Sequence, residues 1–360
     1  MNRRNAAFTL VELMIALAIV MIVLYAAISF FIVSVRQYKV QTKITETNLE
    51  GILGLELLRQ DLENLGYGLP WNNLGNYTEK TGNGSTLNDG STIAPRAVLS
   101  IDGPTFTVNN SDYLVIKSAS VGMSDAARKW TTLTQADLTR DWNPPSENLV
   151  NTDYVIVLAV GATDANRRSL VNETSPYTLY SGVTSAAFLP VDPYSANIVY
   201  GIDTVMPVRP FNRADYYIDN TPGTVPLRCA PITGVLVKAV IAHDAAGNPD
   251  LLPLMDCVAD MQVIYGYKNN PDDNNVLWDP DLATLFPSGP TAAADIRSKL
   301  VEVHVHILAQ EGQRDDSYTT PSDTIVVGSH GMGRNFGVSG YRNYRWKQYS
   351  IVVKPRNLAQ

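Results

Sequence analysis

Glu12 is the residue whose position most strongly suggests a specific chemistry. It lies within an apolar run that begins at Phe8 and continues to about Val35. A carboxylate one turn into such a segment is costly to bury in a membrane and requires a partner. The run has no basic side chain before Arg36, so the cation that would neutralise Glu12 must come from elsewhere.

A cut in the chain between Ala7 and Phe8 would supply that cation. The new α-amino group on Phe8 would lie about one helical turn from Glu12, which would then be the fifth residue of the mature chain. A charge pair between this amine and the Glu12 carboxylate, within one subunit or between neighbours, would offset the cost of burying both groups. Between neighbours, the pair would also set the axial register of one helix against the next.

The apolar run is long enough to cross a membrane. About 20 apolar residues span a bilayer as a helix, and residues 8–35 exceed that length. A secretory signal peptide has a shorter apolar core and small residues after it, whereas here the small residue Ala7 comes before the run. We therefore expect residues 1–7 to be a short basic leader and residues 8–35 to form a transmembrane or filament-core helix.

The segment Ala7-Phe8-Thr9-Leu10-Val11-Glu12-Leu13-Met14-Ile15-Ala16 resembles the prepilin signature of type IV pilins and type II secretion pseudopilins. The resemblance implies cleavage between Ala7 and Phe8 by a prepilin peptidase, N-methylation of Phe8, and subunit docking through Glu12. Two features depart from the usual pattern. Ala7 stands where the family usually has glycine, and residues 8–65 contain no proline, which favours a minor pilin or pseudopilin over the main filament subunit.

The helix that positions Glu12 is expected to continue beyond the membrane surface. Apolar residues keep helical spacing up to Leu65, and Gly66, Gly68 and Pro70 then indicate its end. We predict one helix from Phe8 to Leu65, with residues 36–66 as its soluble half. The apolar face of this half consists of Ile52, Leu55, Leu58, Leu62 and Leu65.

Residues 67–360 are expected to form a β-rich domain. The strand-like segments are 113–116, 154–158, 235–237, 261–265, 299–308 and 346–354. Gly, Asn, Asp, Ser and Pro are frequent in the predicted loops, which are 71–95, 120–150, 161–185, 219–226, 268–292 and 310–340. Residues 120–200 are a candidate insertion. The predicted fold class is α+β and pilin-like, with a long N-terminal helix packed on an antiparallel β-sheet.

The segment 299–308 shows the clearest alternation. Val303, Val305 and Ile307 alternate with His304 and His306, which predicts a strand with one buried and one solvated face. The two histidines would share a face and could chelate a metal, but the sequence places no third ligand near them. We interpret them as part of the solvated face.

Other polar clusters are also better explained by ordinary structure. Asn270, Asp272 and Asn274 form a weak calcium candidate, because the stretch lacks the glycine and glutamate of an EF-hand and its residue types are common in loops. Residues 328–333 are glycine-rich without a phosphate-binding pattern, and we predict a flexible loop. A basic and aromatic cluster near the C-terminus is interpreted as a partner contact or plain surface; it comprises Tyr341, Arg342, Tyr344, Arg345, Trp346 and Lys347.

The composition narrows the class of protein. The chain has 360 residues and a formal net charge of −7, which fits a globular protein and makes a broad nucleic-acid surface unlikely on charge grounds. Cys229 and Cys257 are the two cysteines. They could form one disulfide if the domain is exported, or remain two buried thiols. No cofactor and no enzymatic activity are expected.

Later segments resemble the PilW-type minor pilins. The resemblance implies an inner-membrane, single-pass protein with a periplasmic C-terminal domain, which enters the pilus as an initiating or tip subunit. Its implied partners are other minor pilins, the major pilin, the prepilin peptidase and the inner-membrane assembly platform. The alternatives are a J-like minor pseudopilin of type II secretion and a pilin-anchored adhesin or hydrolase. The resembling segments are 58–68, 258–266, 296–308 and 349–357.

Overall fold

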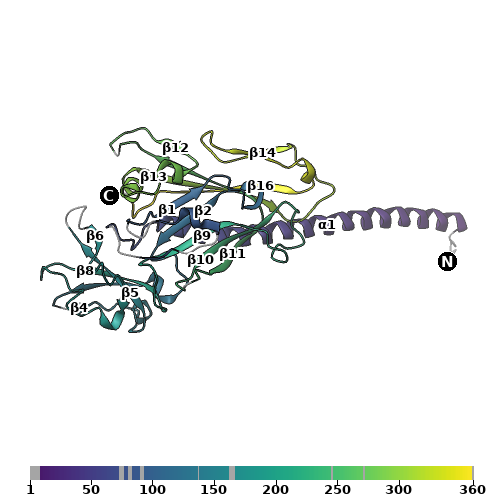
Figure 1. The fold of residues 1–360 in the computed structure, drawn as a ribbon. Helices are drawn as coiled ribbons and strands as arrows, with labels where there is room; N and C mark the ends of the chain where they lie inside the picture. Colours follow the sequence, from purple (N-terminus) through teal and green to yellow (C-terminus); the bar gives the residue numbers. More distant parts are fainter. Residues whose placement is uncertain are drawn as a thin grey trace, which may run out of the picture.

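A single long helix, α1 (Leu10–Glu63), dominates the shape of the molecule. At 1.5 Å per residue its 54 residues extend roughly 80 Å. Its first half projects away from the rest of the chain, and its second half lies along the β-rich domain (Figure 1). This computed structural model describes residues 9–72, 77–79, 83–89, 93–136, 138–161, 167–244, 246–270 and 272–358.

The second half of α1 is held against the domain by a leucine face and two glycines. Leu55, Leu58, Leu62 and Leu65 are buried in the main core, as the helical spacing predicted, whereas Ile52 is exposed. The glycines at 51 and 54 are buried where α1 meets strand β11 (Pro249–Tyr267). Because they carry no side chain, the helix backbone approaches the strand closely at this point.

The main sheet has eight strands, all antiparallel to their neighbours. Its order is β1-β2-β9-β10-β11-β13-β16, and β12 pairs with β11. α1 packs against β11, β13 and β16. The strands are β1 (Val98–Ile101), β2 (Tyr113–Ser118), β9 (Asn212–Asp219), β10 (Gly234–Ile241), β11 (Pro249–Tyr267), β12 (Leu277–Asp279), β13 (Leu300–Glu311) and β16 (Arg345–Val353). The predicted α+β, pilin-like fold class is confirmed.

A second sheet of six strands is inserted between β2 and β9. Its order is β4-β3-β8-β5-β6, with β7 paired to β5, and it has a small core of its own around Val155, Val157 and Phe188. The sheet lies at the end of the molecule opposite to the N-terminus (Figure 1). Its strands are β3 (Trp130–Thr134), β4 (Leu138–Thr139), β5 (Tyr154–Val160), β6 (Arg167–Leu170), β7 (Thr178–Leu179) and β8 (Asn197–Asp203).

Several predicted loops therefore contain regular structure. The predicted loop 120–150 includes β3 and β4, and 161–185 includes β6 and β7. The predicted loop 310–340 includes the hairpin of β14 (Thr324–Val327) and β15 (Arg334–Gly337). These strands are only two to five residues long, so even the β-branched β14 is too short to stand out in a segment rich in loop-forming residues.

Short helices complete the fold. Two α-helices, α2 (Leu282–Leu285) and α3 (Ala292–Lys299), lie between β12 and β13. α2 lies within the predicted loop 268–292, and α3 begins at its last residue. Asp281 caps α2 by accepting a hydrogen bond from the backbone amide of Thr284 at 3.0 Å. The 3-10 turns are Asn83–Leu87, Val108–Asn110, Asp125–Arg128, Pro145–Glu147, Tyr180–Gly182 and Ser339–Tyr341.

A buried network of charges fastens the segment after α1 to the main sheet. The Lys117 ammonium on β2 binds the carboxylates of Glu79 and Asp89 at 2.8 and 2.5 Å. Arg96 binds Asp89 at 2.6 Å, and Arg213 on β9 binds Glu79 at 2.8 Å. Burial opposes ionisation of Asp89, but the Lys117 and Arg96 cations outweigh it and hold its pKa below the ordinary value. Removing one member would leave its partners buried and unpaired, at a cost of several kcal/mol.

Gly54→Ala should destabilise the protein although alanine is the better helix former. A Cβ at Gly54 would overlap the backbone carbonyl of Leu254, which cannot move independently of β11. We expect the free energy of unfolding to fall by about 1–3 kcal/mol, measured by urea denaturation of the detergent-solubilised chain. Gly51→Ala is the matched control, because there the added Cβ meets only the flexible end of Met255. Equal stability of the two variants would contradict the close approach.

Candidate assembly surface

Glu12 lies at the start of α1 and is exposed. Thr9 is the N-cap: its hydroxyl accepts a hydrogen bond from the Glu12 amide at 3.3 Å, and the Glu12 carboxylate accepts one from the Thr9 amide at 2.9 Å. This reciprocal arrangement is a capping box and places the carboxylate at the positive end of the helix dipole. The predicted cleavage and methylation positions, Ala7 and Phe8, lie outside the described residues, so the Glu12–amine pair stays a prediction.

The first half of α1 exposes apolar side chains around its whole circumference. Residues 10–33 include exposed leucine, isoleucine, valine, methionine and phenylalanine. α1 is long and apolar enough to span a membrane, and none of the apolar window that meets this test is buried within the chain. A helix that is apolar on every side requires lipid or other helices around it. The helix is consistent with a single-pass, membrane-anchored protein.

A second exposed apolar face lies on the second half of α1, beyond a mostly polar stretch at residues 34–48. Leu49, Leu53 and Leu57 follow each other at intervals of four residues and are all exposed, Leu53 by 72%. The helical spacing in the sequence predicted the buried leucine face but not the exposure of this second face. The four-residue spacing was visible in the sequence, but spacing alone does not tell which of two apolar faces is covered by the domain.

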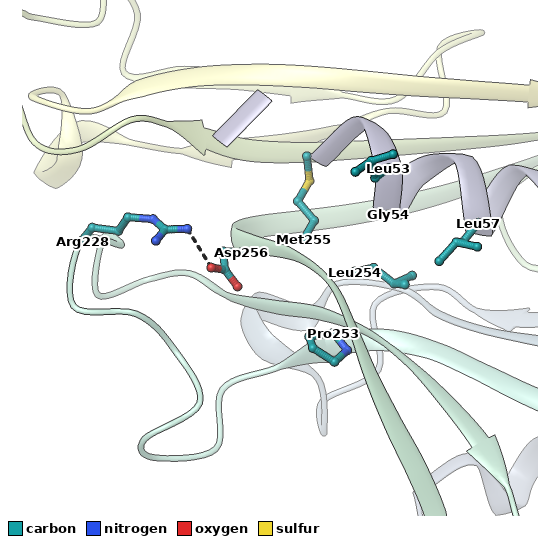
Figure 2. Close-up of a pocket in the computed structure, with 8 residues that line it drawn as sticks. All are labelled: Leu53, Gly54, Leu57, Arg228, Pro253, Leu254, Met255 and Asp256. Carbon is teal, nitrogen blue, oxygen red and sulfur yellow. Dashed lines mark hydrogen bonds and ion pairs between the residues drawn. The ribbon is translucent and has the colours of Figure 1, made fainter. Parts of the chain in front are cut away.

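A groove of about 390 Å³ runs beside this second face (Figure 2). Leu53 and Leu57 form one side, and Pro253 and Met255 from β11 form the other. An ion pair between Arg228 and Asp256, 2.8 Å long, closes one end. The groove is thus apolar along its length and charged at its rim. Sequence reasoning had no signal for it, because α1 and β11 are about 200 residues apart.

A disulfide holds the charged end of the groove in place. Cys229 and Cys257 are bonded, with their Cα atoms 5.0 Å apart. Each is the neighbour in sequence of one member of the Arg228–Asp256 pair. The bond therefore fixes the loop that carries Arg228 onto β11. Both cysteines are buried, so the bond is shielded from solvent.

The histidine strand face is not solvated, so that prediction was wrong. His304 and His306 are only 6% and 4% exposed. The β14–β15 hairpin covers this face: Ser329, which follows β14, hydrogen-bonds His306 Nε2 at 2.9 Å. His304 hydrogen-bonds Glu302 at 3.0 Å. The alternation of apolar and polar residues showed two faces, but a hairpin contributed by a later segment buries the polar one.

The other polar candidates are engaged in local structure. Asn270 and Asp273 exchange hydrogen bonds within the turn after β11, where the Asp272 amide also donates to Asn270 at 3.4 Å. Asn274 lies in the same turn. Among the described residues, no group of three or more histidine, cysteine, aspartate or glutamate side chains is arranged to hold a metal ion. The glycine-rich segment 328–333 forms the turn of the β14–β15 hairpin.

The C-terminal basic cluster is largely neutralised by neighbouring acids. Arg345 pairs with Asp315 at 3.0 Å, and Lys347 pairs with Glu311 at 3.0 Å. Lys347 also donates to Asn48 on α1 at 3.2 Å. These contacts join β16 to the helix, so the cluster is part of the junction between helix and domain instead of a free cationic surface.

Comparison with known proteins identifies one family model. Residues 2–28 match the prokaryotic N-terminal methylation motif. Together with the long N-terminal helix and the antiparallel sheets that follow it, this match supports a type IV pilin-like protein. No curated protein and no solved structure matches the chain.

Lowering the pH from about 7 to 4 should weaken the domain through His306. Burial, reinforced by His304 and His330, lowers the pKa of His306 from 6.5 to about 4. Between these values the unfolded chain binds a proton that the folded chain does not, so stability falls as the pH falls and levels off below the folded pKa. We expect His306 to contribute about 1–2 kcal/mol to the loss in urea denaturation, allowing for solvent screening; the buried His243, whose pKa burial lowers to about 2, adds to the total loss. The His306→Gln variant should lose less stability over this pH range. An unchanged pH profile in this variant would argue against His306 as a cause of the loss.

Proposed function

We propose that the chain is a PilW-type minor pilin that acts in type IV pilus assembly as an initiating or tip subunit. The observation that carries the proposal is the division of α1 into an exposed apolar half with the methylation motif and a half packed on a β-rich domain. A helix of this kind has a free apolar surface suited to lipid before assembly and to other helices afterwards. No catalytic step is part of the proposal.

The proposed orientation of the chain in the membrane follows from the leader and the helix. A short basic leader before residues 8–35 favours a cytoplasmic N-terminus by the positive-inside rule, with residues 67–360 in the periplasm. A disulfide is typical of that oxidising compartment. Prepilin peptidase would then cut between Ala7 and Phe8, and Phe8 would be N-methylated. The inner-membrane assembly platform would extract the subunit into the pilus.

The size of the domain supports a position at the tip or at initiation. Nearly 300 residues follow α1, and the second sheet adds a lobe at the end far from the N-terminus (Figure 1). Such a domain would crowd a shaft in which every subunit packs its helix against many neighbours. A J-like minor pseudopilin of type II secretion would share these features, and the identity of co-purified subunits separates the two.

We further propose that the groove beside Leu53 receives the helix of a neighbouring pilin-like subunit. The exposed leucine face lies on the same helix as the apolar residues 10–33, beyond a mostly polar stretch at residues 34–48. Partners assembled through the same kind of apolar helix would cover both stretches at once. Burial of one leucine on association contributes about 1.5–3 kcal/mol, enough for more than tenfold in affinity.

Glu12→Ala should leave the chain membrane-bound and processed but abolish piliation. The variant removes the carboxylate expected to pair with the Phe8 amine of a neighbour, so helices would lose their axial register. Pili are counted by electron microscopy, and processing is followed by the change in mass. Glu56→Ala is the control, because Glu56 is an exposed carboxylate further along α1. Cells with this variant should form pili normally. Normal piliation with the Glu12→Ala variant would contradict the proposed role of Glu12 in subunit docking.

Leu53→Glu should weaken co-purification of the chain with other pilin subunits by about tenfold or more. A charge at this position would have to be desolvated when a partner helix enters the groove. The measurement is crosslinking of membranes followed by capture of the tagged chain. Val326→Glu on the β14–β15 hairpin is the matched control, because Val326 is also exposed but lies away from α1. Equal capture by both variants would rule out the groove.

A further inference from the structure

The second sheet carries an aromatic and cationic surface that assembly through α1 does not use. Trp130 begins β3 and is 37% exposed. Its ring lies 4.7 Å from the ring of Trp142, centroid to centroid, and the Arg140 guanidinium lies 4.5 Å from the Trp142 ring. Exposed tryptophan is unusual on a surface without a partner, because burying it is strongly favourable.

Two clefts flank Trp130 and share it as a wall. One, of about 270 Å³, lies at the end of α1 and is lined by Gln60, Asn64 and Tyr67. The other, of about 230 Å³, lies over the loop after β4, where Trp142 and Glu147 line it. Arg128 lines both clefts together with Trp130. The pair of clefts therefore forms a continuous track around one aromatic side chain.

The track is held rigid before any ligand arrives. Trp142 donates from its indole nitrogen to the backbone carbonyl of Trp130 at 2.6 Å, and its amide donates to Asn148 at 2.6 Å. Thr131 donates to the carbonyl of Arg140. These hydrogen bonds fix the loop after β4 through its backbone. The other groups that line the clefts remain available to a ligand. A ligand would thus lose little affinity to the ordering of the protein.

The polar groups along the track are free to bind. Within the described residues, the side chains of Gln60, Arg128, Lys129, Asn143 and Glu147 make no hydrogen bond or ion pair. Asp61, in contrast, is neutralised by Lys238 at 2.5 Å. The free groups combine two cations, one carboxylate and two amides. This mixture is mildly positive on a chain whose net charge is −7.

We propose that this track binds an acidic oligosaccharide, a chain of sugar rings that carry carboxylates. Trp130 would cover the apolar face of one ring, the amides and Glu147 would bind ring hydroxyls, and Arg128 and Lys129 would pair with the sugar carboxylates. Single-stranded nucleic acid fits less well. Strand binders offer successive aromatic faces for successive bases, whereas the Trp142 ring already contacts Trp130 and Arg140, and Glu147 would repel phosphates.

The test is a titration of the full-length chain in detergent micelles with an alginate hexasaccharide, which has one carboxylate per ring. We expect saturable binding by calorimetry, at least about tenfold tighter than that of neutral maltohexaose. Trp130→Ala should weaken binding about tenfold, and Arg128→Gln should weaken it and reduce its salt dependence. Tyr194→Ala, an aromatic residue 98% exposed on the same lobe but away from the clefts, should bind as the unmodified chain does.

Three results would overturn the proposal. They are the absence of saturable binding to the hexasaccharide, unchanged affinity in Arg128→Gln, and tighter binding of a thymidine 12-mer than of the hexasaccharide. Trp130 packs on Trp142, so its replacement could disturb the loop. If thermal unfolding shows that Trp130→Ala is destabilised, the exposed Arg128→Gln variant decides the question. The outcome is independent of the assembly role, since none of these residues lies in the groove beside Leu53.

Discussion

The packing of the second half of α1 on the main sheet is the contact on which the rest of the structure depends. The leucine face from Leu55 to Leu65 supplies the apolar part of that contact, and Gly54 allows the helix backbone to approach β11. The Asp61 carboxylate adds a buried anchor, accepting hydrogen bonds from Lys238 at 2.5 Å and from the Tyr216 hydroxyl. Once this half is fixed, the first half must project from the domain, because a helix without proline continues in nearly the same direction.

The packing of α1 on the main sheet separates the molecule into regions that are suited to different functions. The projecting half of α1 exposes only apolar residues and the Glu12 carboxylate, so it is suited to lipid and to other helices. The domain places its largest addition, the second sheet, at the far end (Figure 1). A ligand surface around Trp130 on that sheet would not interfere with helix packing. The groove beside Leu53 lies between these regions, where a neighbouring helix could contact both the helix and β11.

The buried polar groups show how segments outside the main sheet complete the domain. The charges of Lys117 and Arg213 are buried because the segment that includes Glu79 and Asp89 folds over them. His304 and His306 are buried because the β14–β15 hairpin folds over β13. In both cases the sheet carries polar residues on its outer face, and a segment with complementary groups covers them. Such layers are stable only when every buried polar group has a partner.

The sequence by itself determined the long helix, its buried leucine face, the Glu12 signature and the principal strands, because these depend on local periodicity and on composition. It also placed at least part of β2, β10, β11, β13 and β16 in the main sheet, but not β1, β9 or β12. The tertiary structure alone decided that both faces of β13 are buried, that residues 120–200 contribute a second sheet, and that Leu53 faces a groove formed with Pro253. These features arise from contacts between residues distant in the chain, and no local pattern records which surfaces will meet.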